Sequence, residues 1–253
     1  MRLLLTLLLV IGSSPVFAID LDGRIDFAQR LNLNSSVSAR VESINVAIGQ
    51  QVAQNELLLT LATTSLQAGA DMARAEADAA APRVANMATE LEKAQELFDR
   101  DSLAMVELQR AEQNFAIAEA KLQAARAKLA RAEYLLSQAE IRAPIAGIVL
   151  AIEAGRGQYI NTRVSDQTLI TIADDRSMIA TALLPLEQWK ENLLHRKARV
   201  SYGKQNFQGR VVSIGRQLTS GDNDHPATTL QVKFDANGKL PAGLSVKISI
   251  AGD

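Results

Sequence analysis

The side chains that could support catalysis or hold a metal ion are few and widely separated in this sequence. Its two histidines, His195 and His225, lie in different segments, and the chain has no cysteine. This pattern argues against the ligand spacing of a zinc site. Asp222 and Asp224 beside His225 offer oxygen ligands for a hard cation, but an acidic turn in a loop is the commoner origin of such a cluster. The sequence therefore predicts no metal site.

Motifs that bind phosphate or activate a nucleophile are also missing. The stretch Gly155-Arg156-Gly157 lacks the third glycine and the following helix of a dinucleotide-binding loop, so we interpret it as a turn. We recognise no nucleophile elbow, no phosphate-binding loop and no pair of carboxylates in one pocket. We predict that the protein is not an enzyme and carries no cofactor.

The composition argues against a further class of function. Lysine and arginine number 27 against 28 aspartates and glutamates, which gives a formal net charge of −1. A nucleic-acid-binding face would show a clustered excess of lysine and arginine, so nucleic acid is not an expected partner. Hydrophobic residues make up 47% of the chain, much of it alanine, and aromatic residues only 4%. These values fit a long, thin molecule better than one large aromatic core.

The strongest pattern is a pair of apolar stripes that run in opposite directions from Asp101 and Ser102. In each stripe apolar residues recur at alternating steps of four and three, the seam spacing of a coiled coil. We therefore expect two helices of about 34 residues, each roughly 50 Å long, that pair antiparallel with Asp101 and Ser102 at the tip. Pro82 predicts a kink or a discontinuity in the first helix. The stripes consist of Leu66, Ala70, Ala73, Ala77, Ala80, Val84, Met87, Leu91, Ala94 and Phe98 before the tip, and of Leu108, Ala111, Phe115, Ala118, Leu122, Ala125, Leu129, Ala132, Leu136 and Ala139 after it.

Residues 1–18 have the features of a secretory signal peptide. An apolar run from Leu3 to Ile11 is followed by Val16-Phe17-Ala18, with small residues at the two positions that cleavage requires. We expect the mature chain to begin at Ile19, which is not a cysteine and so carries no lipid. The alternative is a retained membrane anchor, which needs about 20 consecutive apolar residues, and Gly12-Ser13-Ser14-Pro15 interrupts the run.

Segments typical of β-strands flank the two helices. Ser38 to Leu61 indicates short strands with a turn at Gly49-Gln50, and Ile141 to Ile172 repeats this style after Pro144 ends the second helix. These two halves can pair only if the hairpin returns to its starting point. We therefore predict one β module that is discontinuous in the sequence.

The C-terminal part predicts a small β-barrel, because several short strands follow one another between turn residues. Residues 19–37, with alternation at Leu31-Asn32-Leu33-Asn34, should add an edge strand, and Thr219 to Pro226 should form an exposed loop. Leu186 to Leu194, which holds the only tryptophan, is expected to be a short helix. The expected strands are Met178–Leu184, Ala198–Tyr202, Phe207–Ile214, Thr228–Phe234 and Leu244–Ile250.

Four stretches give the sequence a family resemblance. It resembles the membrane fusion protein family, the periplasmic adaptors of tripartite export pumps in Gram-negative bacteria, which includes HlyD-like and resistance-nodulation-division (RND) adaptors. The second stretch is more specific than the first, because its Ala-Pro, glycine and β-branched residues fall in the family's order directly after a coiled coil. The stretches are Val41–Val46 with Gly49–Val52, then Ile141–Val149 with Gly155 downstream, then Phe207–Val211, and finally Leu240–Leu244.

The resemblance implies a mainly β protein with a long α-helical coiled-coil hairpin. The hairpin would be inserted into a split lipoyl-like barrel-sandwich hybrid, and a C-terminal β-barrel would follow. The domains expected on this basis are the signal peptide 1–18, an N-terminal edge strand 19–37, the lipoyl-like halves 38–64 and 141–173, the hairpin 65–140 and the barrel 174–253.

The resemblance also implies that the hairpin tip binds the partner, through Lys93, Leu97, Arg100, Ser102 and Ala104. Many adaptors carry an arginine, a leucine and a serine where this chain has Lys93, Leu97 and Ala104. Lysine keeps the charge but loses the planar fork of arginine. Alanine removes a helix cap that would have formed a capping box with Glu107, and we expect Ser102 to cap the helix instead.

The function implied is that of a periplasmic adaptor between an inner-membrane transporter, of the RND or ABC type, and an outer-membrane channel, working as a homo-oligomer. It would reside in the periplasm and associate with the inner membrane through the transporter. One alternative is a scaffold for the transporter alone. Another is a lipoyl-like carrier, which needs a modifiable lysine at a tight turn. Lys121 and Lys128 instead lie off the seam on an expected solvated helix face.

Overall fold

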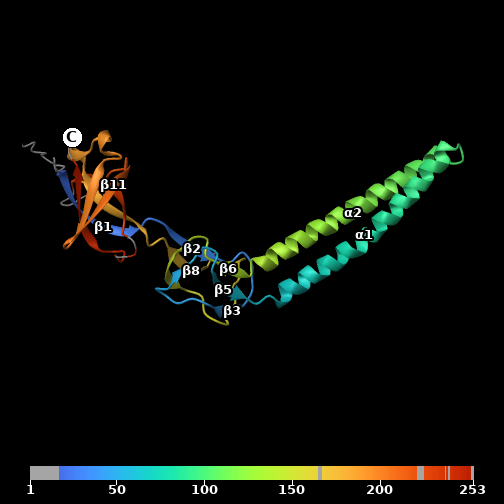
Figure 1. Ribbon diagram of the computed structural model, residues 1–253, viewed down its shortest axis with the longest axis horizontal. Coiled ribbons are helices and arrows are strands. Elements are labelled where there is room, and N and C mark those ends of the chain that lie inside the picture. The colour runs from blue at the N-terminus through green and yellow to red at the C-terminus, as the bar shows by residue number, and fades with distance from the viewer. Residues whose placement is uncertain (1–16, 165–166, 221–224, 237, 239, 252–253) are drawn as a thin grey trace, which may run out of the picture. The chain divides into compact units, whose positions relative to one another are not determined.

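The computed structural model describes residues 17–164, 167–220, 225–236, 238 and 240–251 (Figure 1). Residues 1–16 of the expected signal peptide lie outside this part, as do Asp222 and Asp224. The chain forms two compact units. For the described residues, one unit lies within Asn32–Thr171, and the other lies within residues 17–31 and 172–251.

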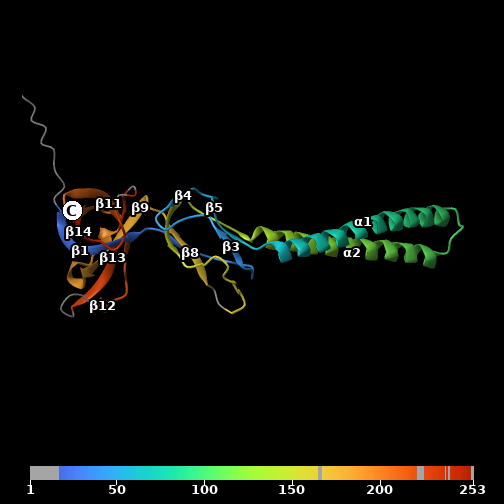
Figure 2. The ribbon, with the colours of Figure 1, turned by 90° about the horizontal axis from the view of Figure 1, so that it is seen from below.

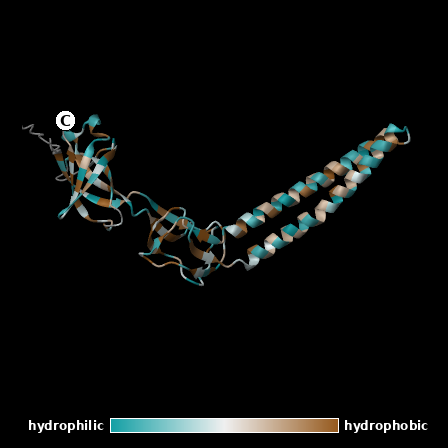
Figure 3. Cartoon of the chain, viewed as in Figure 1, coloured by the Kyte–Doolittle hydropathy of each residue, from teal (hydrophilic) through white to brown (hydrophobic). Residues whose placement is uncertain are grey.

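Two long helices form the predicted hairpin in the first unit. Helix α1 spans Thr64–Asp99 and helix α2 spans Met105–Ser137, and they lie side by side in both Figure 1 and Figure 2. Every residue of the two predicted stripes is buried or half-buried, whereas most other helix positions are exposed. Figure 3 shows the result as hydrophilic segments that alternate with pale or hydrophobic ones along both helices. The prediction of an antiparallel coiled-coil hairpin is confirmed.

Ion pairs lie beside the apolar seam and join the two helices. Arg74 donates to Glu133 at 2.8 Å, and Lys128 donates to Glu76 at 2.7 Å. The hydrogen bond to Glu133 and its negative charge raise the pKa of Arg74 above the usual arginine value. All four side chains are about half exposed, so these pairs contribute little stability. They do favour one alignment of α1 against α2.

Pro82 does not divide the first helix. Helix α1 runs without interruption through it, and Pro82 lies on the exposed side. Of the two outcomes predicted for Pro82, the discontinuity is therefore not found, and the kink stays a prediction. Proline lacks the N–H that would bond the carbonyl of Asp78. Because this position faces solvent, water can hydrate the carbonyl at low cost.

Two small sheets in the Asn32–Thr171 unit join segments from before and after the hairpin. The three-stranded sheet has the order β3-β5-β6 and the four-stranded sheet the order β2-β8-β7-β4. Strand β5 pairs with β6, and β4 pairs with β7, both antiparallel. The β module predicted to be split by the hairpin is thus formed. The strands are β2 (Arg30–Asn34), β3 (Val41–Ile44), β4 (Gln51–Val52), β5 (Leu57–Leu61), β6 (Glu140–Arg142), β7 (Gly147–Ile152) and β8 (Thr168–Ala173).

Backbone hydrogen bonds close this module at two places. The amide of Leu61 donates to the carbonyl of Ala139 at 2.8 Å, where the two helices meet the sheets. The predicted turn Gly155-Arg156-Gly157 is present, with Gln158 donating to the Gly155 carbonyl at 3.0 Å and with Gly157 at a φ of 83°. Such a φ is adopted readily by glycine alone. The Gly157 amide then donates to Val41 across the module at 2.9 Å.

The second unit contains the predicted barrel. Its sheet has the order β11-β10-β14-β1-β9-β13-β12, and pairing of β11 with β13 closes six of these strands into a ring. The core is aliphatic and includes Ile25, Met178, Leu230 and Ile248. The strands are β1 (Phe17–Phe27), β9 (Ser177–Pro185), β10 (Lys197–Tyr202), β11 (Gln205–Ile214), β12 (Thr219–Ser220), β13 (Pro226–Asp235) and β14 (Ser245–Ala251).

The structure also differs from the sequence-based expectation in the strands and loops. Pro144 does not end the second helix, because α2 ends at Ser137 and β6 lies between them. Residues 19–37 do not form one edge strand, because β1 pairs with β14 on one side and with β9 on the other. A closed barrel has no free edge, and β1 fills the gap between those strands. Of the two strands in this stretch, only β2 lies at a sheet edge. The expected loop Thr219–Pro226 begins with β12, and the expected helix Leu186–Leu194 is two 3-10 turns, η1 (Leu186–Gln188) and η2 (Glu191–Leu193).

A larger side chain in the seam should destabilise the hairpin. Ala70 is fully buried between the helices, so an Ala70→Leu substitution would have to separate them, at a cost of about 1–3 kcal/mol. Chemical denaturation followed by circular dichroism at 222 nm measures this loss. The control is Met72→Leu on the same helix, where the side chain is 74% exposed, and it should change little. Equal stability of the two variants would contradict the seam.

Candidate partner interface at the hairpin tip

The chain reverses direction between the helices in a short turn that begins with two backbone hydrogen bonds to the end of α1. The Asp101 amide donates to the Phe98 carbonyl at 2.9 Å, and the Ser102 amide donates to the Leu97 carbonyl at 2.8 Å. Asp101 has a φ of 54°, in the left-handed region. These two bonds and this φ define a Schellman motif at the end of α1, with an aspartate where glycine is usual. The tip predicted at Asp101 and Ser102 is therefore a defined structure.

The predicted capping by Ser102 is wrong. Ala104 is the N-cap residue of α2, with a ψ of 144° and no side-chain hydrogen bond. The hydroxyl of Ser102 donates instead to the Arg100 carbonyl at 3.1 Å. The Schellman motif explains this, because it makes Ser102 part of the end of α1. The first turn of α2 is consequently left without a side-chain cap.

The five residues predicted to bind the partner are all exposed. Lys93 and Leu97 lie on the last turns of α1, with Leu97 43% exposed, and Arg100, Ser102 and Ala104 follow in the turn. The turn thus brings them to one end of the hairpin. This places them where a partner could bind, but it does not test their role.

Two further apolar side chains extend this surface. Met105 is 56% exposed and Val106 is 69% exposed at the start of α2. The sequence analysis missed them because they precede the first seam residue, Leu108. They could have been predicted from the sequence as exposed apolar residues, because they lie next to the tip and outside the seam. We define the tip surface as Lys93, Leu97, Arg100, Met105 and Val106, a set of apolar side chains with two cations.

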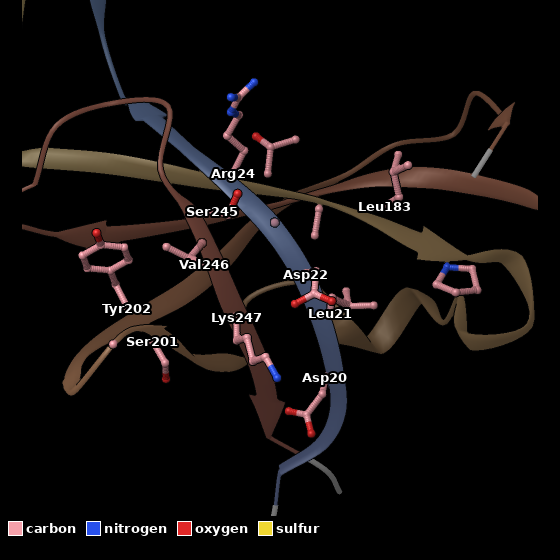
Figure 4. Close-up of a pocket in the computed structure, with 15 residues that line it drawn as sticks. Asp20, Leu21, Asp22, Arg24, Leu183, Ser201, Tyr202, Ser245, Val246 and Lys247 are labelled. Atoms are coloured by element: carbon pink, nitrogen blue, oxygen red, sulfur yellow. The ribbon is translucent and has the colours of Figure 1, made fainter. Parts of the chain in front are cut away.

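A groove on the described barrel does not resemble a catalytic centre. It has a volume of about 1050 Å³ and is open to solvent between β1, β9, β10 and β14 (Figure 4). Asp20 and Asp22 line it together with Arg24 and Lys247, and Asp22 lies opposite Lys247 in the strand register. Its carboxylates are therefore balanced by cations.

The other residues considered for chemistry are dispersed. His195 and His225 are exposed. Among the residues that the structure describes, no three histidine or carboxylate side chains are grouped so as to bind a metal ion. Lys121 is exposed on α2, and Lys128 pairs with Glu76. No helix within the described ranges combines the length and the apolar character needed to cross a bilayer.

Comparison with known proteins identifies a family. The family model described as "RND MFP, barrel-sandwich hybrid domain" matches residues 29–172, more than half of the chain. The chain is 28% identical over 199 residues to the uncharacterized protein YdhJ of Escherichia coli (strain K12), covering 78% of this chain and 68% of that protein.

Solved structures agree in fold. The membrane fusion protein Spr0693 of Streptococcus pneumoniae R6 superposes with a TM-score of 0.71 at 15% identity, covering 93% of this chain and 100% of that one. A MacA–MexA chimeric protein containing the Pseudomonas aeruginosa MexA α-hairpin domain gives 0.70 at 18% identity, covering 94% and 82%.

Restoring a cap should stabilise the first turn of α2. In Ala104→Ser the new hydroxyl can accept the Glu107 N–H, a contribution of about 1 kcal/mol. Hydrogen exchange should show roughly fivefold slower exchange of the first-turn amides of α2, since 1.4 kcal/mol corresponds to tenfold. Ser102→Ala is the control and should leave those amides unchanged. If Ser102→Ala accelerated their exchange, Ser102 would be the cap after all.

Proposed function

We propose that this chain, which belongs to the RND membrane fusion protein family, is the periplasmic adaptor that links an inner-membrane transporter to an outer-membrane channel in a tripartite pump. The single observation that carries this proposal is the exposed tip surface at the end of a long, closed hairpin. A hairpin needed only to support the small sheets would require a few turns, whereas α1 and α2 comprise 36 and 33 residues.

The mechanism follows from what this chain can supply. It offers length, alignment and attachment surfaces, and the transporter would provide the energy for export. Several copies would assemble side by side around an axis, with the tip surfaces toward the channel. In this proposal the two sheets of the Asn32–Thr171 unit form the lipoyl-like module, and the cofactor that such modules carry elsewhere has no counterpart here.

Changes of the tip surface should abolish export without unfolding the protein. Lys93→Glu reverses a charge and Leu97→Asp places a carboxylate at an apolar contact, while both positions are exposed. Export is measured with compounds that accumulate in cells when the gene is deleted. A variant that has lost export should accumulate them to the same level. Lys93→Arg, which keeps the charge, is the matched control and should export at least as well as the original chain. Normal export by both damaging variants, at normal protein levels, would argue against tip docking.

A scaffold that binds the transporter alone is the second candidate, because Lys93 and Ala104 depart from the family's tip pattern. Cross-linking separates the two candidates cleanly, since the chain has no cysteine. A single cysteine at Val106 should cross-link to an outer-membrane protein in cells if the tip docks. A cysteine at Met72, equally exposed but distant along α1, is the control. The scaffold model expects no such product from Val106. A carrier would instead show a lipoyl or biotinyl addition in the intact mass.

A further inference from the structure

Three cations lie side by side on the outer surface of the barrel. Lys197 of β10 is opposite Arg210 of β11 in the strand register, and Arg210 is opposite Lys233 of β13. We call these three residues the cation row. All three are exposed, and within the described part of the chain none of them forms an ion pair. Like charges directly opposite one another destabilise a sheet, so folding does not account for this arrangement.

The strands that carry the cation row have few carboxylates. Together β10, β11 and β13 hold four cations, the fourth being Arg199, against the one carboxylate of Asp235. Burial opposes ionisation of the nearby Asp174, but hydrogen bonds from Arg176 and the charge of Lys233 lower its pKa below the usual range. The hydrogen-bonded partner of Asp174 is Arg176, at 3.0 Å. The cation row therefore keeps its excess of positive charge.

The neighbouring segments do not reverse this excess. Residues 186–196, between β9 and β10, carry two glutamates and two basic residues, Lys190 and Arg196. Residues 215–225 carry one arginine and two aspartates. Strand β12 in that segment pairs with Pro226 and Ala227, at the far end of β13 from the cation row.

The cation row lines a groove with a volume of about 800 Å³. Gly209 also lines it, and the missing side chain lets β11 lie close to β13, since a Cβ there would be 2.8 Å from the carbonyl oxygen of Lys233. The ladder between these strands is irregular at Val211 and Ser213, next to Arg210, and such irregularities redirect side chains. A surface that enters the groove can therefore contact all three cations at once.

The length of the cation row defines what fits it. Adjacent strands are about 4.8 Å apart, so the outer two cations start about 10 Å from each other. On a helix, residues i, i+4 and i+7 lie on one face and also span about 10 Å, at about 1.5 Å per residue. Three carboxylates with this spacing would oppose the three cations one to one.

The hairpin of this chain carries such a set at the end of α1. Glu92, Glu96 and Asp99 have the spacing i, i+4 and i+7, and we call them the acid row. They are exposed, lie outside the seam and form no ion pair among the described residues. No other three carboxylates of the described helices α1 and α2 have this spacing.

The surroundings of the acid row are acidic as well. Lys93 and Arg100 lie on an adjacent face, turned roughly 80–100° around the helix from Glu92. Between residues 90 and 112 these two and Arg110 are the only basic residues. The carboxylates of the same stretch are Glu90, Glu92, Glu96, Asp99, Asp101, Glu107 and Glu112. The end of the hairpin and the cation row are thus matched in both charge and spacing.

We propose that the cation row of one copy binds the acid row of a second copy of this chain. Because the charges are exposed, the contact is weak and sensitive to salt. One consequence rests on the proposed adaptor function. The acid row shares the last turns of α1 with Lys93, Leu97 and Arg100 of the tip surface, so a barrel bound there covers that surface. Self-association then keeps the tip from docking until the two copies separate.

Sedimentation equilibrium tests the contact with protein purified from the periplasmic fraction of cells expressing the full chain. Association should rise with protein concentration at about 0.01 M salt, where the Debye length is about 30 Å, and should be lost at about 1 M, where it is about 3 Å. Arg210→Glu and Glu96→Lys should each weaken association roughly tenfold, because each places like charges in contact.

Mixing the two variants shows which surfaces meet. Arg210→Glu places a carboxylate in the middle of the cation row, and Glu96→Lys places a cation in the middle of the acid row. The mixture should therefore associate as the original chain does, although neither variant does so alone. The controls Lys204→Glu and Glu119→Lys make the same charge changes at exposed positions outside both rows, and each should associate normally. Thermal unfolding of each variant shows that it is folded.

Two results would overturn the proposal. One is an original chain that stays monomeric at low salt. The other is a mixture that associates no better than the separate variants, which would assign any association to other surfaces. The assay contains neither transporter nor channel, so its failure would leave the adaptor function to be judged by export and cross-linking.

Discussion

The Asn32–Thr171 unit depends on one constraint: the end of α2 must return to the start of α1, so that the strands before and after the hairpin can pair. Strands β5 and β6 pair directly at the base of the hairpin, and the Leu61 amide reaches the Ala139 carbonyl there. The strand register therefore fixes the alignment of the helices, and the seam fixes it again along their length. A change of length in one helix alone would disrupt either the strand register or the packing of the seam. Matched changes of seven residues in both arms preserve the seam, so a hairpin of this kind varies in length without altering the sheets.

Alanine in the seam explains how such a long hairpin remains thin. The buried seam residues of α1 are Ala70, Ala73 and Ala77, and those of α2 include Ala118 and Ala125. Small side chains let the helix axes approach closely, but each buries little apolar area. Stability must then accumulate over many turns, assisted by ion pairs beside the seam. The outer faces need not be apolar, and they remain charged.

The sequence predicted the helices and strands better than it predicted which elements lie next to one another. Periodicity located the seam and its tip residue by residue, because one narrow face of each helix is buried. The alternation at Leu31-Asn32-Leu33-Asn34 indicated an edge strand within residues 19–37, but it could not show that β1 has partners on both sides. Ser102 was misassigned because a hydroxyl caps a helix from the N-cap position, and Ser102 lies two residues before the N-cap residue Ala104. The left-handed φ of Asp101 instead makes Ser102 part of the motif that ends α1.

Most of the apolar side chains that the fold leaves exposed were missed by the sequence analysis. No described buried side-chain nitrogen or oxygen lacks a hydrogen-bond partner, so the interior gives no sign of an unfilled site. The groups without a protein contact are on the surface. Val106 and Met105 in one unit, and Leu218 and Trp189 in the other, are exposed to water. Exposed leucine or valine does not help folding, because it is solvated in the unfolded chain as well. Grouped exposure of this kind marks surfaces that contact something else. The proposed adaptor function needs more than one attachment, and each of the two compact units has such a group of exposed apolar side chains.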